Sequence, residues 1–200
     1  LNQARVNLNR FGSKIEVIKD LREKRIDVFP NVKPTSFINS NGLMTNNGVI
    51  WPLGSISNIT TILGNELGYY PIIDLDEHGF NNPKGLYNNN IDIMLTGDSF
   101  TEGYSVNADK NIRAVLTQLG NSVISLGKGG NGPLVELAVL KEYAEPLKPK
   151  IVLWLFFTND LDDLKKYTGK SSLLRKYLNE DNFSQNLISR QSEIDSVLKS

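Results

Sequence analysis

The turn Gly97-Asp98-Ser99 is the segment of this chain best suited to nucleophilic chemistry. It follows directly after residues 91–96, a mostly apolar segment of strand length. A glycine permits a sharp turn and a close approach of the backbone, and open α/β sheets bind their ligands at the C-terminal ends of their strands. We therefore predict that Ser99 is a nucleophile exposed to a cleft and that Asp98 supports the site. The simpler alternative is that Ser99 is an ordinary turn residue.

A glycine-rich loop follows the next predicted strand. It spans residues 127–132 and contains Gly127, Gly129, Gly130 and Gly132. Their N–H groups could point at a developing oxyanion, or the glycines could simply allow a turn that needs positive φ. The spacing also matches the G-x-G-x-x-G dinucleotide fingerprint, but the acidic residue expected about 20 positions further on is missing. We rank the nucleotide-binding interpretation below the oxyanion interpretation.

A third polar segment, Thr158-Asn159-Asp160, ends the apolar run Ile151 to Phe157. It could be no more than a polar strand terminus. An asparagine amide is also a neutral and directional donor, which suits stabilisation of an oxyanion. We expect the Asn159 amide to point into the same cleft as Ser99, because the ends of parallel strands meet at one edge of a sheet.

The order and spacing of these three segments resemble the SGNH (GDSL-type) hydrolases, which carry a GDS serine, an oxyanion glycine and a G-x-N-D asparagine. The resemblance implies that Ser99 is the nucleophile. It also implies an oxyanion hole made of the Ser99 N–H, the Gly130 N–H and the Asn159 side chain. The implied activity is that of a serine esterase or acyl-hydrolase without a cofactor. Its substrates would be small-molecule or glycan esters, such as O-acetyl groups on carbohydrates or lipids.

The resemblance covers residues 74–163. Within it, residues 76–83 (DEHGFNNP) look like the lead-in segment of a bacterial SGNH subgroup. The chain departs from the family at Phe157, which stands where the asparagine motif has its glycine.

The general base is the larger departure. A serine hydroxyl needs a neighbouring base to become nucleophilic at neutral pH, and the resemblance implies a histidine from a C-terminal D-x-x-H motif. The one histidine, His78, precedes Ser99, and Leu75 stands where such a motif would have its aspartate. We interpret His78 as a turn or packing residue, and we expect the base to lie beyond Ser200. These residues alone are then expected to have little activity.

A β–α alternation from residue 91 onward predicts the α/β class. We expect a flavodoxin-like, three-layer α/β/α fold with a parallel sheet, incomplete because three core strands are visible where such sheets have about five. The expected strands and helices are 91–96, 108–119, 122–126, 134–145, 151–157, 161–178 and 183–198. Asn107 is expected to cap the helix over 108–119, Gly120 to end it, and Pro133 to open the next helix. The apolar run 151–157 is typical of a parallel strand buried on both faces, and the apolar stripe of the last two helices is expected to be buried. Residues 91–200 are predicted to be the hydrolase core, truncated at its C-terminal end. Residues 1–90 are predicted to be an irregular α+β extension with a helix at 13–25.

Composition limits the partners and leaves the compartment open. Lys and Arg number 22, as do Asp and Glu, so the net charge of zero argues against a nucleic-acid partner. No cysteine is present, and the acids around His78 lack a defined metal-ligand geometry, so we predict no metal site. No membrane segment is expected, because the longest apolar run falls well short of the roughly 20 residues needed. Either the cell envelope or the cytoplasm fits, and the oligomeric state is not assigned. The alternative functions are a non-catalytic glycan-binding or assembly protein and a nucleotide-binding domain.

Overall fold

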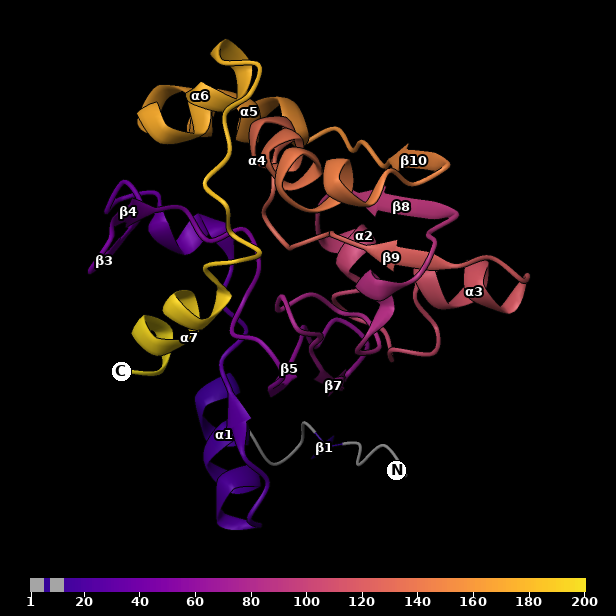
Figure 1. The fold of residues 1–200 in the computed structure, drawn as a ribbon. Coiled ribbons are helices and arrows are strands. Elements are labelled where there is room, and N and C mark those ends of the chain that lie inside the picture. Colours follow the sequence, from indigo (N-terminus) through magenta and orange to yellow (C-terminus); the bar gives the residue numbers. More distant parts are fainter. Residues whose placement is uncertain (1–5, 8–12) are drawn as a thin grey trace.

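A parallel sheet of three strands lies in the right half of the molecule as drawn in Figure 1. The computed structural model describes residues 6–7 and 13–200 and has a mixed α/β architecture, as predicted. The strands are β8 (Ile93–Thr96), β9 (Val123–Ser125) and β10 (Ile151–Trp154), in the order β10-β8-β9. Leu95 of β8 pairs with Leu153 and with Ser125, and both pairings are parallel. The C-terminal ends of the three strands therefore meet at one edge of the sheet.

Helices follow each of these strands. They are α2 (Ser99–Glu102), α3 (Ile112–Gln118), α4 (Pro133–Val139), α5 (Asp160–Lys170), α6 (Ser172–Asn179) and α7 (Gln191–Lys199). A π-helical turn (Leu140–Ala144) and a 3₁₀ turn (Glu145–Leu147) extend α4. Pro133 opens α4 at its first helical position, where its missing N–H leaves no hydrogen bond unmade.

Helix α3 begins later than the predicted residue 108. Asn111, not Asn107, is its N-cap, because the Asn111 side chain accepts a hydrogen bond from the Ala114 N–H at 2.8 Å. The predicted stop at Gly120 is confirmed, since the helix ends at Gln118 and Gly120 follows with a φ of 92°. Both asparagines are good N-cap types, so sequence alone does not decide between them.

The region before residue 90 combines one helix with short strands, as predicted. Helix α1 (Lys14–Glu23) starts at a capping box, in which the Ser13 and Glu16 side chains bond to each other's backbone. The strands are β1 (Val6–Asn7), β2 (Val28–Phe29), β3 (Leu43–Thr45), β4 (Gly48–Ile50), β5 (Thr60–Ile62), β6 (Tyr69–Tyr70) and β7 (Ile72–Asp74), with 3₁₀ turns at Pro34–Phe37 and Leu86–Asn88. Strand β5 lies between β2 and β7, β3 pairs with β4, and β1 pairs with β6.

Residues on both sides of the predicted boundary at 90 share one hydrophobic core. Trp51 and Leu53 lie in the same buried cluster as Ile124 of β9 and Leu134 of α4. The region before residue 90 therefore packs directly against strand β9 and helix α4.

Strand β10 corrects the prediction of a strand over 151–157 that is buried on both faces. It ends at Trp154, and the side chains of Ile151, Val152, Leu153 and Trp154 are 51%, 44%, 40% and 45% exposed. Successive side chains of a strand point to opposite faces, so neither face of β10 is fully covered, and as an edge strand it has β8 on one side only. An apolar run shows that a strand suits a buried position, but its neighbours decide whether it is covered.

The apolar stripe of the C-terminal helices is buried in large part, as predicted. Leu174, Leu187 and Ile194 are buried in the main core cluster, whereas Leu178 and Ile188 stay exposed. Residues 183–190 precede α7 and are not helical, which corrects the predicted helix over 183–198. Within residues 6–7 and 13–200, no helix has both the length and the apolar character to span a bilayer.

Candidate functional site

The turn after β8 is fixed by close backbone contacts. At Gly97 φ is 152°, and a Cβ there would lie 2.2 Å from Thr101 Oγ1 and 2.8 Å from the Leu155 carbonyl oxygen. A side chain at this position is therefore excluded. Asp98 is buried and caps α2, because its carboxylate accepts a hydrogen bond from the Phe100 N–H at 3.0 Å. Ser99 becomes the first residue of that short helix and is half-buried.

The glycine loop after β9 packs directly on α2. A Cβ at Gly127 would lie 2.5 Å from the Glu102 backbone nitrogen, so only glycine fits between the two segments. The Lys128 N–H donates to the Gly97 carbonyl at 3.4 Å, which ties the loop to the turn that carries Ser99. The sheet edge thus brings two of the three predicted segments together.

The Gly130 N–H is free in this loop. The Gly130 carbonyl accepts a hydrogen bond from the Tyr167 hydroxyl at 2.8 Å, whereas no described residue accepts from the Gly130 N–H or from the Ser99 N–H. The neighbouring Gly129 N–H is already bonded to the Glu102 carboxylate at 2.8 Å. Of the two adjacent glycines, Gly130 is therefore the one whose N–H is available to a ligand.

Asn159 lies on the β10 side of the same edge. The Phe157 and Phe100 rings are 5.1 Å apart between centroids, so the segments after β10 and β8 are in contact. Asn159 is exposed, and its amide nitrogen donates to Asp163 at 3.2 Å across the start of α5. An amide group carries two donors, so one N–H remains for a ligand after this bond is made.

Buried carboxyl groups lie between the two sides. Glu136 on α4 is fully buried, and the Trp154 indole N–H donates to it at 2.6 Å. Burial raises the pKa of Glu136 to about 7 against the effect of that hydrogen bond, with Asp160 and Asp98 adding to the rise. Burial likewise raises the pKa of Asp160, although the Phe157 N–H donates to its carboxylate at 2.6 Å.

These carboxyls are incompletely paired. One oxygen of Glu136 and one of Asp160 are buried without a hydrogen-bond partner among the described residues. In that part of the chain, no group of three or more His, Cys, Asp or Glu side chains is arranged to hold a metal ion. A pKa of about 7 suits the Glu136 carboxyl to proton exchange near neutral pH. The sequence did not indicate this, since an acid in the first turn of a helix is common.

His78 packs away from this edge. Its ring lies against Tyr87 and Tyr143, at 4.6 Å and 5.5 Å between centroids, and none of its described contacts is with Ser99. Burial lowers the pKa of His78, so the neutral form is favoured. The packing interpretation of this residue fits its surroundings.

Residues 76–83, the lead-in segment, are hydrogen-bonded to strand β9. Asp76 is buried, and burial raises its pKa to about 6. It accepts hydrogen bonds from the His78 and Phe80 N–H groups at 2.8 and 2.9 Å and from the Asn82 amide at 2.7 Å. The Asn82 side chain also exchanges hydrogen bonds with the backbone of Ser125, at 2.9 and 2.8 Å. The segment thereby anchors the strand that leads into the glycine loop.

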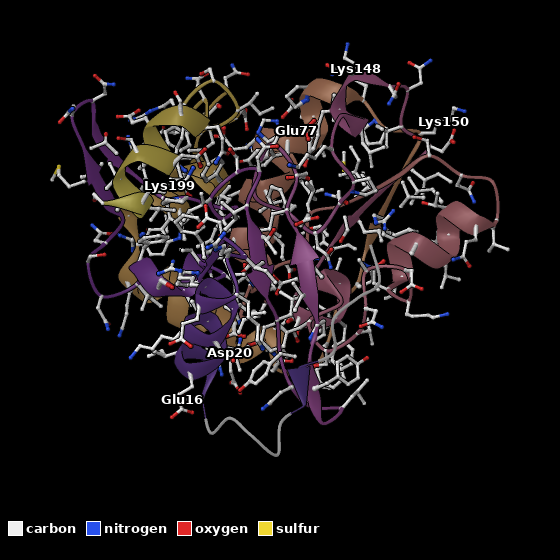
Figure 2. All side chains as sticks on the ribbon, turned by 90° about the horizontal axis from the view of Figure 1, so that it is seen from below. Glu16, Asp20, Glu77, Lys148, Lys150 and Lys199 are labelled. Atoms are coloured by element: carbon white, nitrogen blue, oxygen red, sulfur yellow. The ribbon has the colours of Figure 1, made fainter. Side chains whose placement is uncertain are left out.

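Sequence reasoning missed a buried ion pair behind the site. The Lys128 ammonium lies 3.3 Å from Glu102, and both side chains are 0% exposed. Other lysines, such as Lys148, Lys150 and Lys199, lie at the surface (Figure 2). Two features of the sequence could have indicated the pair. Lys128 stands among glycines in the loop 127–132, and Glu102 is the acid of the segment 97–103 (GDSFTEG) that contains Ser99.

Comparisons with known proteins identify no relative: no family model matches the chain, and neither a curated protein nor a solved structure does.

Proposed function

We propose that this chain carries the nucleophile and the oxyanion hole of a serine esterase of SGNH type. The observation that carries the proposal is the pair of free N–H groups of Ser99 and Gly130, held at one edge of a parallel sheet by the Gly97 turn and the glycine loop. Such donors stabilise a developing oxyanion because they are fixed before the reaction begins. The resemblance of the three motifs to the SGNH hydrolases supports the same assignment.

In this reaction the Ser99 hydroxyl attacks the carbonyl carbon of an ester, and a general base takes its proton. The carbonyl oxygen becomes an oxyanion that accepts hydrogen bonds from the Ser99 N–H, the Gly130 N–H and the Asn159 amide. Collapse of this intermediate expels the alcohol, which takes up the proton, and leaves an acyl-serine. Water then hydrolyses the acyl group by the reverse sequence of proton transfers. The family resemblance favours O-acyl groups of glycans or lipids as substrates.

The finer fold assignment belongs to the same proposal. The order β10-β8-β9 places the first strand between the second and the third, as in the first three strands of the flavodoxin-like order 2-1-3-4-5. We propose that β8, β9 and β10 are these three strands of a flavodoxin-like sheet. The exposed outer edge of β10 is where a fourth strand would pair.

The packing of the glycine loop weighs against nucleotide binding. The Gly129 N–H is bonded to a buried carboxylate, and Gly127 packs on the backbone of α2. A phosphate cradle needs several glycine N–H groups that face solvent, and here two of the loop glycines are already engaged with α2. The esterase therefore accounts better for the loop.

The experiment is chemical rescue with an external base. The chain of residues 1–200 is incubated with an aryl acetate at increasing imidazole concentration, with the Ser99→Ala variant as the blank for hydrolysis by imidazole itself. We expect imidazole to raise the Ser99-dependent rate and an acetyl group to appear on Ser99 in a peptide mass map. Equal rates for the chain and for Ser99→Ala at every imidazole concentration, with no acetylated peptide, would overturn the proposal.

Two further variants identify a base within the chain. If turnover without imidazole is appreciable and His78→Ala abolishes it, then His78 is the base, and the expected base beyond Ser200 is wrong. If Glu136→Gln abolishes it instead, the Glu136 carboxyl takes the proton. If the wild-type chain turns over only when imidazole is added, neither His78 nor Glu136 acts as the general base.

A further inference from the structure

Glu102 is a fully buried carboxylate on the same short helix as Ser99. Its Oε1 accepts hydrogen bonds from the Asn31 amide at 2.8 Å and from the Lys128 ammonium at 3.3 Å. Lys128 in turn donates to the side-chain amide oxygen (Oδ1) of Asn31 at 2.8 Å, which closes a small ring of polar groups. A charge this deep persists only when it is paired and hydrogen-bonded, and these contacts satisfy that requirement.

The other oxygen of Glu102 reaches the glycine loop. Oε2 accepts the Gly129 N–H at 2.8 Å, one peptide before the N–H of Gly130. On the far side of Gly130, its carbonyl is held by the Tyr167 hydroxyl at 2.8 Å. The backbone is therefore fixed on both sides of the free Gly130 N–H, and one of the two fixing groups is carried by α2.

Glu102 is also held by its own backbone. Its carbonyl accepts a hydrogen bond from the Asn81 amide at 2.8 Å, and its N–H donates to the Asp98 carbonyl at 3.0 Å. Asn31 and Asn81 both come from the region before residue 90, so this region braces the helix that presents Ser99. The carboxylate thus links three segments that are far apart in the sequence.

We propose that Glu102 is a positioning residue that sets the Gly130 N–H relative to the Ser99 N–H, so that both donors face one oxyanion. The inference rests on the proposed esterase function. Helix α2 holds Ser99 and Glu102 at a fixed separation. The hydrogen bond from the Gly129 N–H to Glu102 therefore fixes the position of the glycine loop relative to Ser99. A carboxylate is required because it meets three donors and donates to none, whereas a glutamine would turn its NH₂ toward one of them.

The first measurement tests the link itself without any substrate. In a ¹⁵N-glycine-labelled chain, an N–H bonded to a buried carboxylate is shifted downfield and exchanges slowly with solvent. Glu102→Gln is expected to move the Gly129 resonance upfield and to shift Gly130. Glu66→Gln is the matched control, because Glu66 is an exposed carboxylate that accepts one hydrogen bond, from the Ser105 hydroxyl at 2.8 Å, three residues after Glu102.

The second measurement separates positioning from general loss of structure. Sulfur is a larger and weaker hydrogen-bond acceptor than oxygen, so an aligned oxyanion hole favours an aryl ester over the matching thionoester. In the imidazole-rescued reaction, Glu102→Gln is expected to lower the ester rate by at least about 10-fold through kcat, a fraction of the usual loss of one oxyanion donor. The thionoester rate should fall much less, so the ratio of the two rates collapses. Glu66→Gln should keep that ratio.

The double variant Glu102→Gln/Lys128→Met guards against failure to fold, since it removes both buried charges together. It is expected to show the same glycine shifts and the same loss of the rate ratio as Glu102→Gln. Two results would overturn the positioning role. One is a Gly129 resonance in Glu102→Gln that matches that of the wild type. The other, in a wild type that is active, is an ester-to-thionoester rate ratio that Glu102→Gln leaves unchanged. A wild-type chain without Ser99-dependent turnover would instead overturn the esterase proposal, while the glycine resonances still report the link.

Discussion

The two sides of the candidate site differ in how completely the protein has ordered them. On the β9 side, the turn, helix α2 and the glycine loop are held by Glu102 and Lys128, whose buried charges are paired. On the β10 side, the strand is exposed along its length and Asn159 faces solvent. The buried carboxyls on this side, Glu136 and Asp160, have no ion-pair partner among the described residues, and burial raises the pKa of each. The comparison indicates that Ser99 and the Gly130 N–H, the proposed nucleophile and oxyanion donor, are held firmly in place, whereas the β10 side is open to solvent.

Loss of Lys128 should have the largest effect on stability. Lys128→Met leaves the Glu102 charge buried and uncompensated, which typically costs about 3–5 kcal/mol. The control is Lys150→Met, because Lys150 pairs with Asp92 at 2.6 Å but has a 72% exposed side chain; exposed pairs contribute about 1 kcal/mol or less. Urea unfolding of both variants measures the difference. If the two substitutions lower the free energy of unfolding equally, the buried pair of Lys128 and Glu102 does not hold the β9 side of the site in place.

The two flanking strands offer a matched test of packing. Ile124 of β9 is 0% exposed and Val152 of β10 is 44% exposed. Ile124→Ala should cost about 2–5 kcal/mol through lost burial and the cavity left behind, and Val152→Ala less than about 1 kcal/mol. Chemical denaturation compares them. A cost for Val152→Ala near that of Ile124→Ala would mean that β10 is covered in solution by another chain.

The raised pKa of Glu136 predicts that the free energy of unfolding depends on pH. An acid whose pKa is raised by folding binds its proton more tightly in the folded state. Its contribution to stability is complete below the ordinary value of 4.5 and is lost as the pH rises through about 7. We expect Glu136→Gln to remove this loss, so the variant gains up to about 2–3 kcal/mol over the wild type between pH 5 and pH 8.

Thermal unfolding of both proteins across that range measures this gain. Asp76, whose pKa is also raised to about 6, titrates in both proteins and so cancels in the difference. A wild-type curve parallel to that of Glu136→Gln would show that Glu136 titrates at its ordinary pKa.

Local patterns in the sequence predicted the central part of this arrangement. The Gly97 turn and the Pro133 helix start depend on contacts within a few residues, and both were predicted. The buried ion pair was not, because Asn31, Glu102 and Lys128 are separated by 71 and 26 positions. Lysine and glutamate are ordinarily surface residues, and only tertiary packing places these two at 0% exposure.

Strand β10 shows the opposite limit of the sequence. Its apolar run correctly predicted a parallel strand, because β-forming residue types favour pairing in a sheet. It did not predict exposure, since burial depends on what lies on the other side of the strand. The site residues carry the same distinction: Gly97 and Gly127 are explained by the contacts around them, whereas the role of Asn159 depends on a ligand.

Asn159 should therefore show the smallest effect on stability and a large effect on turnover. Its side chain is exposed and makes one described hydrogen bond, to Asp163 at 3.2 Å, so Asn159→Ala should change the free energy of unfolding by less than about 0.5 kcal/mol. Asn31→Ala is the control from the ordered side. It removes an amide that bonds to both Glu102 and Lys128, and leaving those buried groups short of a partner should cost about 1–3 kcal/mol. In the imidazole-rescued reaction, Asn159→Ala should lower the Ser99-dependent rate by about 100-fold, the usual loss for one oxyanion donor. A stable Asn159→Ala variant with the full wild-type rate would remove Asn159 from the oxyanion hole and leave the Ser99 and Gly130 N–H groups as its donors.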